Sequence, residues 1–210
     1  MKIAETARSI IQGIYLLSPY CWVDSYLKSR EGRHATGSRE QQALRDTRLE
    51  LSERYIGYWL FAAIGFFLAS ELLPAWVAVL LLLRAVGILN KELGVVLFGI
   101  CKITEGTAVS ATGRVIVLAL VNYLTALFLF AASYAMLGGL DGLPDYAAAS
   151  ERVAGLLHAA QIHFSLASSF EPATLTVAAL STLQSAYCFL FGTLVISLFV
   201  SLLSVRPLQA

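Results

Sequence analysis

Residues 150–174 read SERVAGLLHAAQIHFSLASSFEPAT, a short apolar helix pattern that ends in an acidic residue and a proline. Ser150 is a favourable N-cap and Glu151 lies in the first turn, so a helix is expected to begin here. At about 1.5 Å per residue, a helix over 150–169 crosses only part of a roughly 30 Å hydrocarbon layer before Pro172. The segment therefore predicts a half-length helix that enters a membrane and returns to the same side.

The composition of the chain is that of an integral membrane protein. Hydrophobic residues make up 58% of the 210 residues, charged residues make up 14%, and the mean hydropathy is +0.71. An average soluble domain has about 45–50% hydrophobic residues and about 25% charged residues. These values exclude a disordered protein, a nucleic-acid binder and an ordinary soluble enzyme. The three widely spaced cysteines, Cys21, Cys101 and Cys188, are not typical of a disulfide framework or a zinc site.

Four apolar runs precede and follow the half-length helix. The expected spans lie near 55–72, 74–93, 115–138 and 178–204. The fold class predicted is therefore an all-α integral membrane protein with four transmembrane helices and a re-entrant pore helix between the last two. Arg84 lies inside the second run, where snorkelling or pairing with a neighbouring helix is the simplest interpretation.

The N-terminal quarter of the chain has a different character. Apolar residues recur at helical spacing from Ile3 to Leu17, and charged residues crowd the segment from Lys28 to Arg54. The first pattern predicts an amphipathic helix that lies in the membrane interface or packs under the bundle. The second predicts a solvated helix, with docking of a partner or of anionic lipid as the alternative.

These patterns divide the chain into three parts. Residues 1–54 form cytoplasmic or interfacial helices, residues 55–113 the first two spans and a basic cytoplasmic loop over 91–114, and residues 114–207 a pore-like module. Residues 93–100 continue apolar, so an extension of the second helix below the membrane or along its surface is the alternative there. Residues 1–54 carry nine of the fifteen lysines and arginines, whereas the 138–152 loop carries only Arg152. The positive-inside rule then places both termini in the cytoplasm of a multi-pass protein of the cell membrane.

The third part carries a set of ordered features. They are Arg114 before an apolar run, Asn122-Tyr123, Phe130 to Tyr134, the acidic outer loop, His163-Phe164-Ser165, Gln184, Gly192 and Arg206-Pro207. In this order they resemble the pore module of bacterial two-helix potassium-channel-like proteins, over 94 of the 210 residues. The resemblance implies a homotetramer in a bacterial inner membrane, without enzymatic activity or a cofactor. It also implies inorganic cations as permeating or blocking ions, and a gating hinge at Gly192.

The filter of that family is missing. Its Thr-Val/Leu-Gly-Tyr-Gly-Asp strand stacks carbonyls around potassium, and glycine permits the backbone that this needs. Residues 167–174 instead read ASSFEPAT, and there is no glycine between Gly155 and Gly192. Potassium selectivity is therefore not expected. A surviving filter would be a ring of side chains set by an acidic residue, with pore residues Glu171, Ser168, Ser169, Phe170 and Thr174.

Two histidines lie in the half-length helix. His158 and His163 are five residues apart, about 140° around a helix, so they do not share one metal-binding face. Roles in the core or in hydrogen bonding are expected, with pH sensing as the alternative, and no metal site is predicted.

The leading functional hypothesis is a tetrameric cation-conducting pore that is nonselective or sensitive to divalent ions. The alternative is a non-conducting, potassium-channel-like assembly or sensor subunit. The lipid bilayer, permeating ions and other copies of the chain are the partners expected, and nucleic acid is not. A membrane enzyme or transporter ranks last, because such proteins usually carry paired ionisable residues inside their spans, and such pairs are not evident in these apolar runs.

Overall fold

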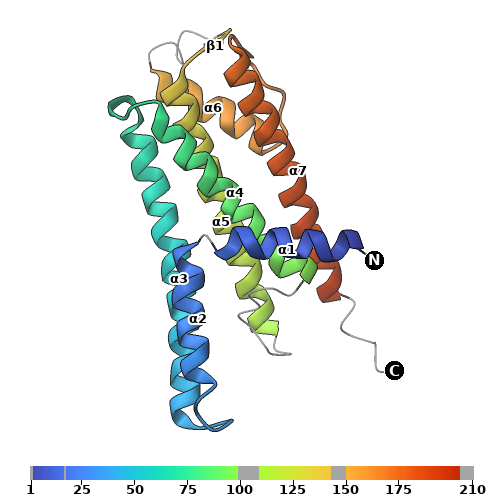
Figure 1. The fold of residues 1–210 in the computed structure, drawn as a ribbon. Coiled ribbons are helices and arrows are strands. Elements are labelled where there is room, and N and C mark those ends of the chain that lie inside the picture. The colour runs from blue at the N-terminus through green and yellow to red at the C-terminus, as the bar shows by residue number, and fades with distance from the viewer. Residues whose placement is uncertain (1, 17, 99–108, 143–149, 204–210) are drawn as a thin grey trace.

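A computed structural model describes residues 2–16, 18–98, 109–142 and 150–203, which are almost entirely helical (Figure 1). In chain order the elements are α1 (Lys2–Leu16), α2 (Pro19–Glu31), α3 (Arg39–Leu68), the 3₁₀ turn η1 (Ser70–Leu72), α4 (Trp76–Phe98), α5 (Val109–Leu137), β1 (Leu140–Asp141), α6 (Glu151–His163), β2 (Glu171–Pro172) and α7 (Leu175–Leu203). The prediction of an all-α protein is confirmed, with one short antiparallel pairing of β1 with β2.

Two of these helices are long and apolar enough to cross a membrane, namely residues Ile116–Leu137 of α5 and Leu175–Ser197 of α7. In the rest of the described chain no helix meets the same requirements of length and composition. α3 is charged over its first half, and α4 contains Arg84, Lys91 and Glu92. Two of the four predicted spans are thus supported by length and composition.

The long helices run along a common axis and define two ends (Figure 1). We call the end that holds η1, β1 and the start of α7 the outer end, and the opposite end the inner end. α6 lies near the outer end between α5 and α7, whereas α1 crosses the bundle at a steep angle (Figure 1). α2 and the first half of α3 form a hairpin that projects at the inner end.

α3 is one uninterrupted helix of 30 residues rather than a polar helix followed by a separate span. Ser38 caps it, because its Oγ accepts a hydrogen bond from the Gln41 amide at 3.2 Å. Its polar half pairs with α2 through an ion cluster, in which the half-buried Arg48 contacts the buried Asp24 at 3.1 Å and also contacts Glu31. The charged segment of the sequence is therefore a packed helical hairpin.

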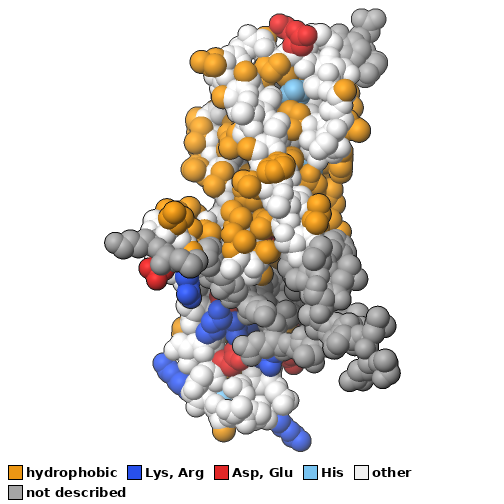
Figure 2. All heavy atoms as spheres, turned by 90° about the vertical axis from the view of Figure 1, so that its right-hand side faces the viewer, with side chains coloured by type: hydrophobic (Ala, Val, Ile, Leu, Met, Phe, Trp, Pro, Cys, Tyr) orange, Lys and Arg blue, Asp and Glu red, His pale blue; other side chains and the backbone are white. Residues whose placement is uncertain are grey.

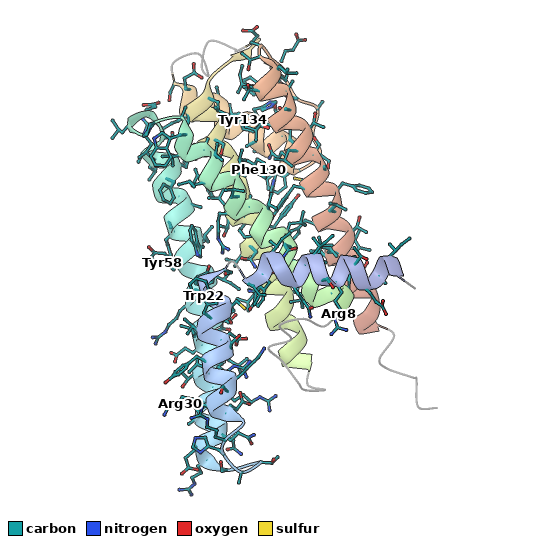
Figure 3. All side chains as sticks on the ribbon, in the orientation of Figure 1. Arg8, Trp22, Arg30, Tyr58, Phe130 and Tyr134 are labelled. Atoms are coloured by element: carbon teal, nitrogen blue, oxygen red, sulfur yellow. The ribbon has the colours of Figure 1, made fainter. Side chains whose placement is uncertain are left out.

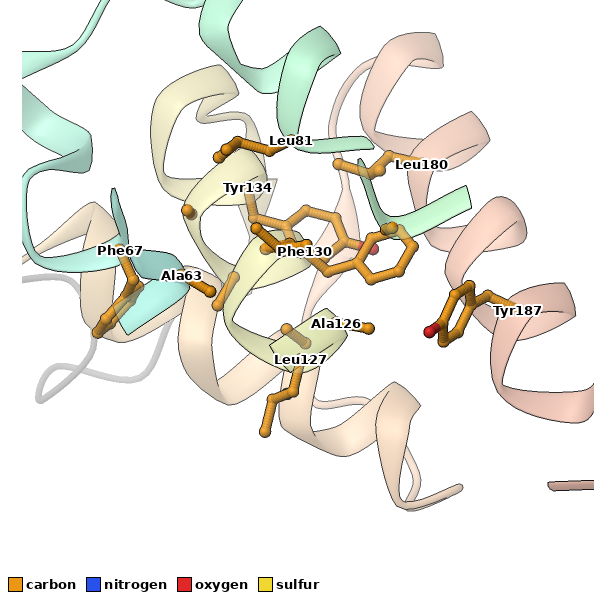
Figure 4. Packing of buried hydrophobic residues seen from close by; sticks show 14 of the residues in the cluster. Ala63, Phe67, Leu81, Ala126, Leu127, Phe130, Tyr134, Leu180 and Tyr187 are labelled. Atoms are coloured by element: carbon orange, nitrogen blue, oxygen red, sulfur yellow. The ribbon is translucent and has the colours of Figure 1, made fainter. Parts of the chain in front are cut away.

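The core lies between the outer halves of the long helices (Figure 4). Phe130 and Tyr134 of α5 point into it and are fully buried, as Figures 3 and 4 show. Gly155 lets α6 press directly on α5, since a Cβ there would lie 2.9 Å from the Ala131 carbonyl oxygen and 3.0 Å from the Ala135 amide nitrogen. This close approach fixes the position of the half-length helix.

α6 ends at His163, six residues before the predicted end at Ser169. The Leu166 amide donates to the Gln161 carbonyl at 2.7 Å, and the Ser165 amide donates to the Ile162 carbonyl at 3.1 Å. Ser165 has a φ of 56°, so the turn is a Schellman motif with serine where glycine is usual. The sequence carries no glycine to signal this end.

α4 continues to Phe98, so the predicted cytoplasmic loop begins later than Lys91. Glu92 is buried within this helix, and its Oε1 accepts a hydrogen bond from the Asn122 amide group of α5 at 2.7 Å. Charged residues at 91 and 92 suggested a loop, but the buried carboxylate has a partner on the next helix.

α1 packs against the bundle, which is one of its two predicted arrangements, and a place in the membrane interface stays a prediction. It packs on α4, where the Asn90 side-chain amide donates to the Ile11 carbonyl at 3.0 Å. Ile3, Ile10 and Ile14 remain exposed on α1.

In Figure 2 the blue Lys and Arg side chains gather toward one end of the molecule, and orange apolar side chains cover much of the remainder. Arg8 and Arg30 lie toward the inner end in Figure 3.

Candidate functional site

α6 and the residues after it form a hairpin that enters the bundle and returns to the outer end. α6 runs inward along α5, with Gly155 against Ala131 and His163 against Tyr123. Residues 164–172, which we call the return segment, then lead back to β2, where Glu171 pairs with Asp141. The predicted path of a short helix followed by a returning chain is thus present, whereas its entry into a membrane stays a prediction.

The return segment is largely extended. From Tyr123 to Leu137 the helix α5 rises about 21 Å at 1.5 Å per residue. The eight steps from His163 to Glu171 cover at most about 26–29 Å when fully extended. The chain therefore has little slack between the inner turn and the outer end. It cannot form a second helix there, and residues 166–170 are neither helix nor strand.

His158 connects the return segment to both flanking helices. Its Nδ1 lies 3.1 Å from Ser168 Oγ, and its Nε2 lies 2.9 Å from Ser181 Oγ on α7. Tyr134 of α5 donates from its hydroxyl to the same Ser181 oxygen at 3.3 Å. The imidazole is 2% exposed, which agrees with the role in the core and in hydrogen bonding expected for it.

The two serine hydroxyls near His158 also bond to the backbone. Ser168 Oγ donates to the Phe170 carbonyl at 3.0 Å, and Ser181 Oγ donates to the Val177 carbonyl at 3.0 Å. A neutral imidazole donates from only one nitrogen, so its other nitrogen must accept a hydrogen bond from a serine hydroxyl. A hydroxyl has one proton, and that serine can therefore donate either to His158 or to its backbone carbonyl partner, but not to both. A doubly protonated ring would let all four hydrogen bonds form together. The hydrogen bonds of the two serines thus depend on the protonation of the ring, and pH sensing by His158 stays a prediction.

His163 lies at the inner turn, against α5 and α7. Its ring stacks on Tyr123 with a centroid distance of 3.8 Å, and its Nε2 lies 2.9 Å from the Tyr123 carbonyl oxygen. The Tyr123 hydroxyl donates to the His163 carbonyl in return. On the other side, Nδ1 lies 3.3 Å from Cys188 Sγ and 3.5 Å from Gln184 Nε2.

The predicted pore residues do not all lie on one surface. Ser169 is exposed, but its amide and hydroxyl bond to the Gln161 side chain at 3.1 and 3.2 Å. Phe170 differs from the expectation, because its side chain is 4% exposed and its edge meets the His158 ring. Thr174 is exposed and accepts a hydrogen bond from the Val177 amide at 3.3 Å, so it caps the start of α7.

Glu171 lies at the outer end, eight residues beyond the end of α6 rather than at that end. It is exposed, and its direct cross-strand neighbour is Asp141, which is also exposed. Opposed residues of an antiparallel pair project to the same side. The outer end therefore presents two adjacent carboxylates per chain. Sequence analysis missed the contribution of Asp141, since 30 residues separate the two positions.

One exposed face combines the return segment with α7. Residues 164–169 are exposed, and on α7 Thr182, Ser185, Phe189 and Thr193 are exposed at helical spacing. A cavity of about 310 Å³ opens between them, lined by Ile162, Ser165, Leu166, Ser185, Cys188 and Phe189. This face therefore carries both hydroxyl groups and apolar side chains.

Gly192 lies inside α7, which stays helical on both sides of it. A Cβ at this position would meet nothing within 4 Å, so close packing does not require glycine here. The hinge at Gly192 stays a prediction. Arg206 and Pro207, which belong to the sequence resemblance, lie outside the described residues.

Arg84 pairs with a neighbouring helix through aromatic rings. Its guanidinium carbon lies 4.4 Å from the centroid of Trp59 and 5.2 Å from that of Tyr55, both on α3. Cation–π contact with these rings stabilises the guanidinium. The expected pairing of Arg84 with a neighbouring helix is thus seen, with aromatic rings of α3 as its partners.

At the outer end, a polar clasp joins η1 to the start of α6. Arg152 Nε lies 2.9 Å from Glu71 Oε1, and Ser150 Oγ donates to the same oxygen at 2.9 Å. The hydrogen bond from Arg152, followed by that from Ser150, holds the pKa of Glu71 below its ordinary value. The clasp therefore favours an ionised carboxylate on the outer surface.

Within the described ranges, no group of three or more His, Cys, Asp and Glu side chains is arranged to hold a metal ion. A scan of family models finds no match to this chain, and searches of curated proteins and of solved structures find none either.

Proposed function

We propose that this chain is a subunit of a homotetrameric membrane pore that conducts cations without the potassium filter. The observation that carries the proposal is the half-length helix α6 with its extended return segment, held between two helices that are each able to cross a membrane. Backbone that is neither helical nor part of a closed barrel is tolerated at membrane depth only beside protein or water. Residues 164–169 are exposed in the single chain, so further copies or water should cover them.

The membrane topology proposed has four spans. The second half of α3 and the helix α4 join α5 and α7, and the basic residues of the inner-end hairpin lie in the cytoplasm. A cysteine introduced at Asp141 should react with an impermeant thiol reagent added outside intact cells. A cysteine at Ala35 should react only after permeabilisation. Reversed labelling would overturn this topology.

Four copies arranged around an axis would enclose a path lined by the exposed face of the return segment and α7. Native mass measurement in detergent should give a tetramer, and purified protein in planar bilayers should pass cation current. A stable monomer would overturn the pore.

The carboxylates at the outer end are proposed to attract cations and to bind calcium. Glu171→Gln removes a charge at nearly constant volume, so it should weaken block by calcium and reduce the preference for cations over anions. Asp46→Asn, at the inner end, is the matched control and should leave both unchanged. Reversal potentials and calcium sensitivity that are identical in wild type and Glu171→Gln would exclude Glu171 as the selectivity element.

The non-conducting alternative rests on a specific observation. The hydroxyls of Ser168 and Ser169 contact His158 and Gln161 within the same chain, which leaves few polar groups free to replace the water around an ion. A tetramer that passes no cation current under any tested pH or calcium concentration would favour an assembly or sensor subunit.

A further inference from the structure

A thiol, an imidazole and a carboxamide meet beside the cavity between the return segment and α7. His163 Nε2 lies 2.9 Å from the Tyr123 carbonyl oxygen, which can only accept a hydrogen bond. In the neutral ring Nε2 therefore carries the proton, and Nδ1 has a free lone pair. Cys188 Sγ lies 3.3 Å from this Nδ1. The lone pair is thus directed at the thiol.

The carboxamide of Gln184 lies beside the same two groups. Gln184 is fully buried, and it precedes Cys188 by one helical turn, so the two side chains share a face of α7. Its Nε2 donates to the Ala159 carbonyl at 2.8 Å and lies 3.5 Å from His163 Nδ1. Its Oε1 finds no hydrogen-bond donor in the described part of the chain. A buried acceptor without a partner points to an additional bound group.

We propose that Cys188, His163 and Gln184 bind a thiophilic divalent cation of the zinc and cadmium class. Tetrahedral zinc holds sulfur at about 2.3 Å and nitrogen at about 2.0–2.1 Å, which separates the two ligands by about 3.5 Å. The observed separation of 3.3 Å needs little movement. A backbone carbonyl on the second ring nitrogen is the usual support of a metal-binding histidine.

The cavity gives the ion access, because Cys188 lines it together with Ser165 and Ser185. On binding, the thiol proton leaves to water, and the sulfur–metal and nitrogen–metal bonds form without oxidation or reduction. Water completes the coordination shell from the cavity side. Thiolate and imidazole ligands favour zinc and cadmium over magnesium and calcium. The site goes beyond the proposed function, since a protein that passes no current can still bind the ion.

The test uses the purified full-length chain in detergent, with Cd²⁺ as the probe and the near-ultraviolet thiolate-to-cadmium absorbance as the readout. A variant with Cys21 and Cys101 changed to serine keeps Cys188 as its only thiol. It should develop the band with one ion per chain, and excess Mg²⁺ should not remove it. Adding Cys188→Ser should abolish the band. Absence of the band in the first variant, or its survival in the second, would overturn the site.

A second variant tests the amide without removing the thiol. Gln184→Leu conserves helix propensity and approximate volume but offers no donor atom to the ion, so it should lower cadmium affinity about tenfold while the band remains. Ser197→Ala, on the exposed side of α7, is the control and should bind like the parent. Circular dichroism and the unfolding midpoint confirm that each variant is folded. Unchanged affinity in Gln184→Leu would overturn the three-donor site.

Discussion

The guanidinium of Arg152 in the first turn of α6 and the carboxylate of Glu71 in η1 are joined by an ion pair of 2.9 Å. Arg152 Nη1 also donates to the Leu68 carbonyl at 2.9 Å, at the end of α3. These contacts fasten the half-length helix to the α3–α4 hairpin at the outer end. The first two long helices thus position the re-entrant element as well as contributing to the bundle.

The clasp predicts a dependence of stability on pH. The pKa of Glu71 is lower in the folded protein than its ordinary value of 4.5, first because of Arg152 and then Ser150. A depressed folded pKa gives stability that is present above the unfolded pKa and lost as pH falls through the folded pKa. The unfolding midpoint of wild type should exceed that of Glu71→Gln at neutral pH, and the difference should shrink below pH 4.5. Asp46→Asn is the control. If its unfolding midpoint differed from that of wild type with the same dependence on pH, the prediction would be contradicted.

Arg48 should be the most sensitive charge of the inner-end hairpin. Burial alone lowers the pKa of Arg48, but hydrogen bonds and charges from Glu31 and Asp24 outweigh it and raise that pKa. Arg48→Met leaves the buried Asp24 with Lys28 alone, so a loss of about 3 kcal/mol is expected. Arg54→Met breaks an exposed pair and should cost less than about 1 kcal/mol. Chemical unfolding followed by circular dichroism measures the free energy of unfolding of both variants. Equal losses in the two would contradict the prediction that the less exposed ion pair contributes more to stability.

The turn after α6 should become more stable with glycine. Ser165 adopts the left-handed conformation, which costs a residue with a Cβ roughly 1–2 kcal/mol. Ser165→Gly removes this cost but adds backbone entropy to the unfolded chain, so a net gain of about 0.5–1 kcal/mol is expected. Ser165→Ala retains the Cβ and should give no gain. Thermal unfolding in detergent compares the three proteins, and a lower midpoint for Ser165→Gly would show that the hydroxyl matters more than the backbone.

The hydrogen bonds of His158 should support the return segment. Ser168→Ala removes the partner of Nδ1 in a buried ring, and a buried polar atom without a partner costs about 1–3 kcal/mol. Ser197→Ala removes an exposed hydroxyl that bonds within its own helix and should cost under about 0.5 kcal/mol. The unfolding midpoint, together with proteolysis near residues 164–169, provides the measurement. Similar behaviour of both variants would mean that His158 does not hold the segment.

Sequence analysis found the features that are encoded locally. Ser150 as a cap, Glu151 after it and Pro172 beyond predicted a helix too short to span, and α6 is 13 residues long. The end of α6 was missed because Ser165 occupies a position where glycine is the usual signal. The hydrogen bonds of this turn, from the amides of Ser165 and Leu166, form only when the chain has already left the helix.

The polar contacts inside the bundle could not be read from local sequence. Glu92 looked like part of a loop because Lys91 precedes it, and its partner Asn122 lies 30 residues away. Ser181 is 23 residues from His158, and the two meet only because α6 and α7 pack side by side. Likewise, a strand pair of two residues brought Asp141 to Glu171. Each case needs the tertiary arrangement of the helices.

The uninterrupted helix α3 has a consequence for the bilayer in which the protein is proposed to lie. Its uncharged part runs from Tyr55 to Leu68, which rises about 21 Å, whereas the apolar stretch of α5 at Ile116–Leu137 rises about 33 Å. The charged half of α3 cannot follow into the hydrocarbon, so one flank of the bundle is hydrophobically thinner than the other. Lipids beside α3 must shorten, or the whole protein must tilt toward that side. Such an asymmetric mismatch makes membrane thickness itself a force on α3 and, through Leu68 and Glu71, on the half-length helix.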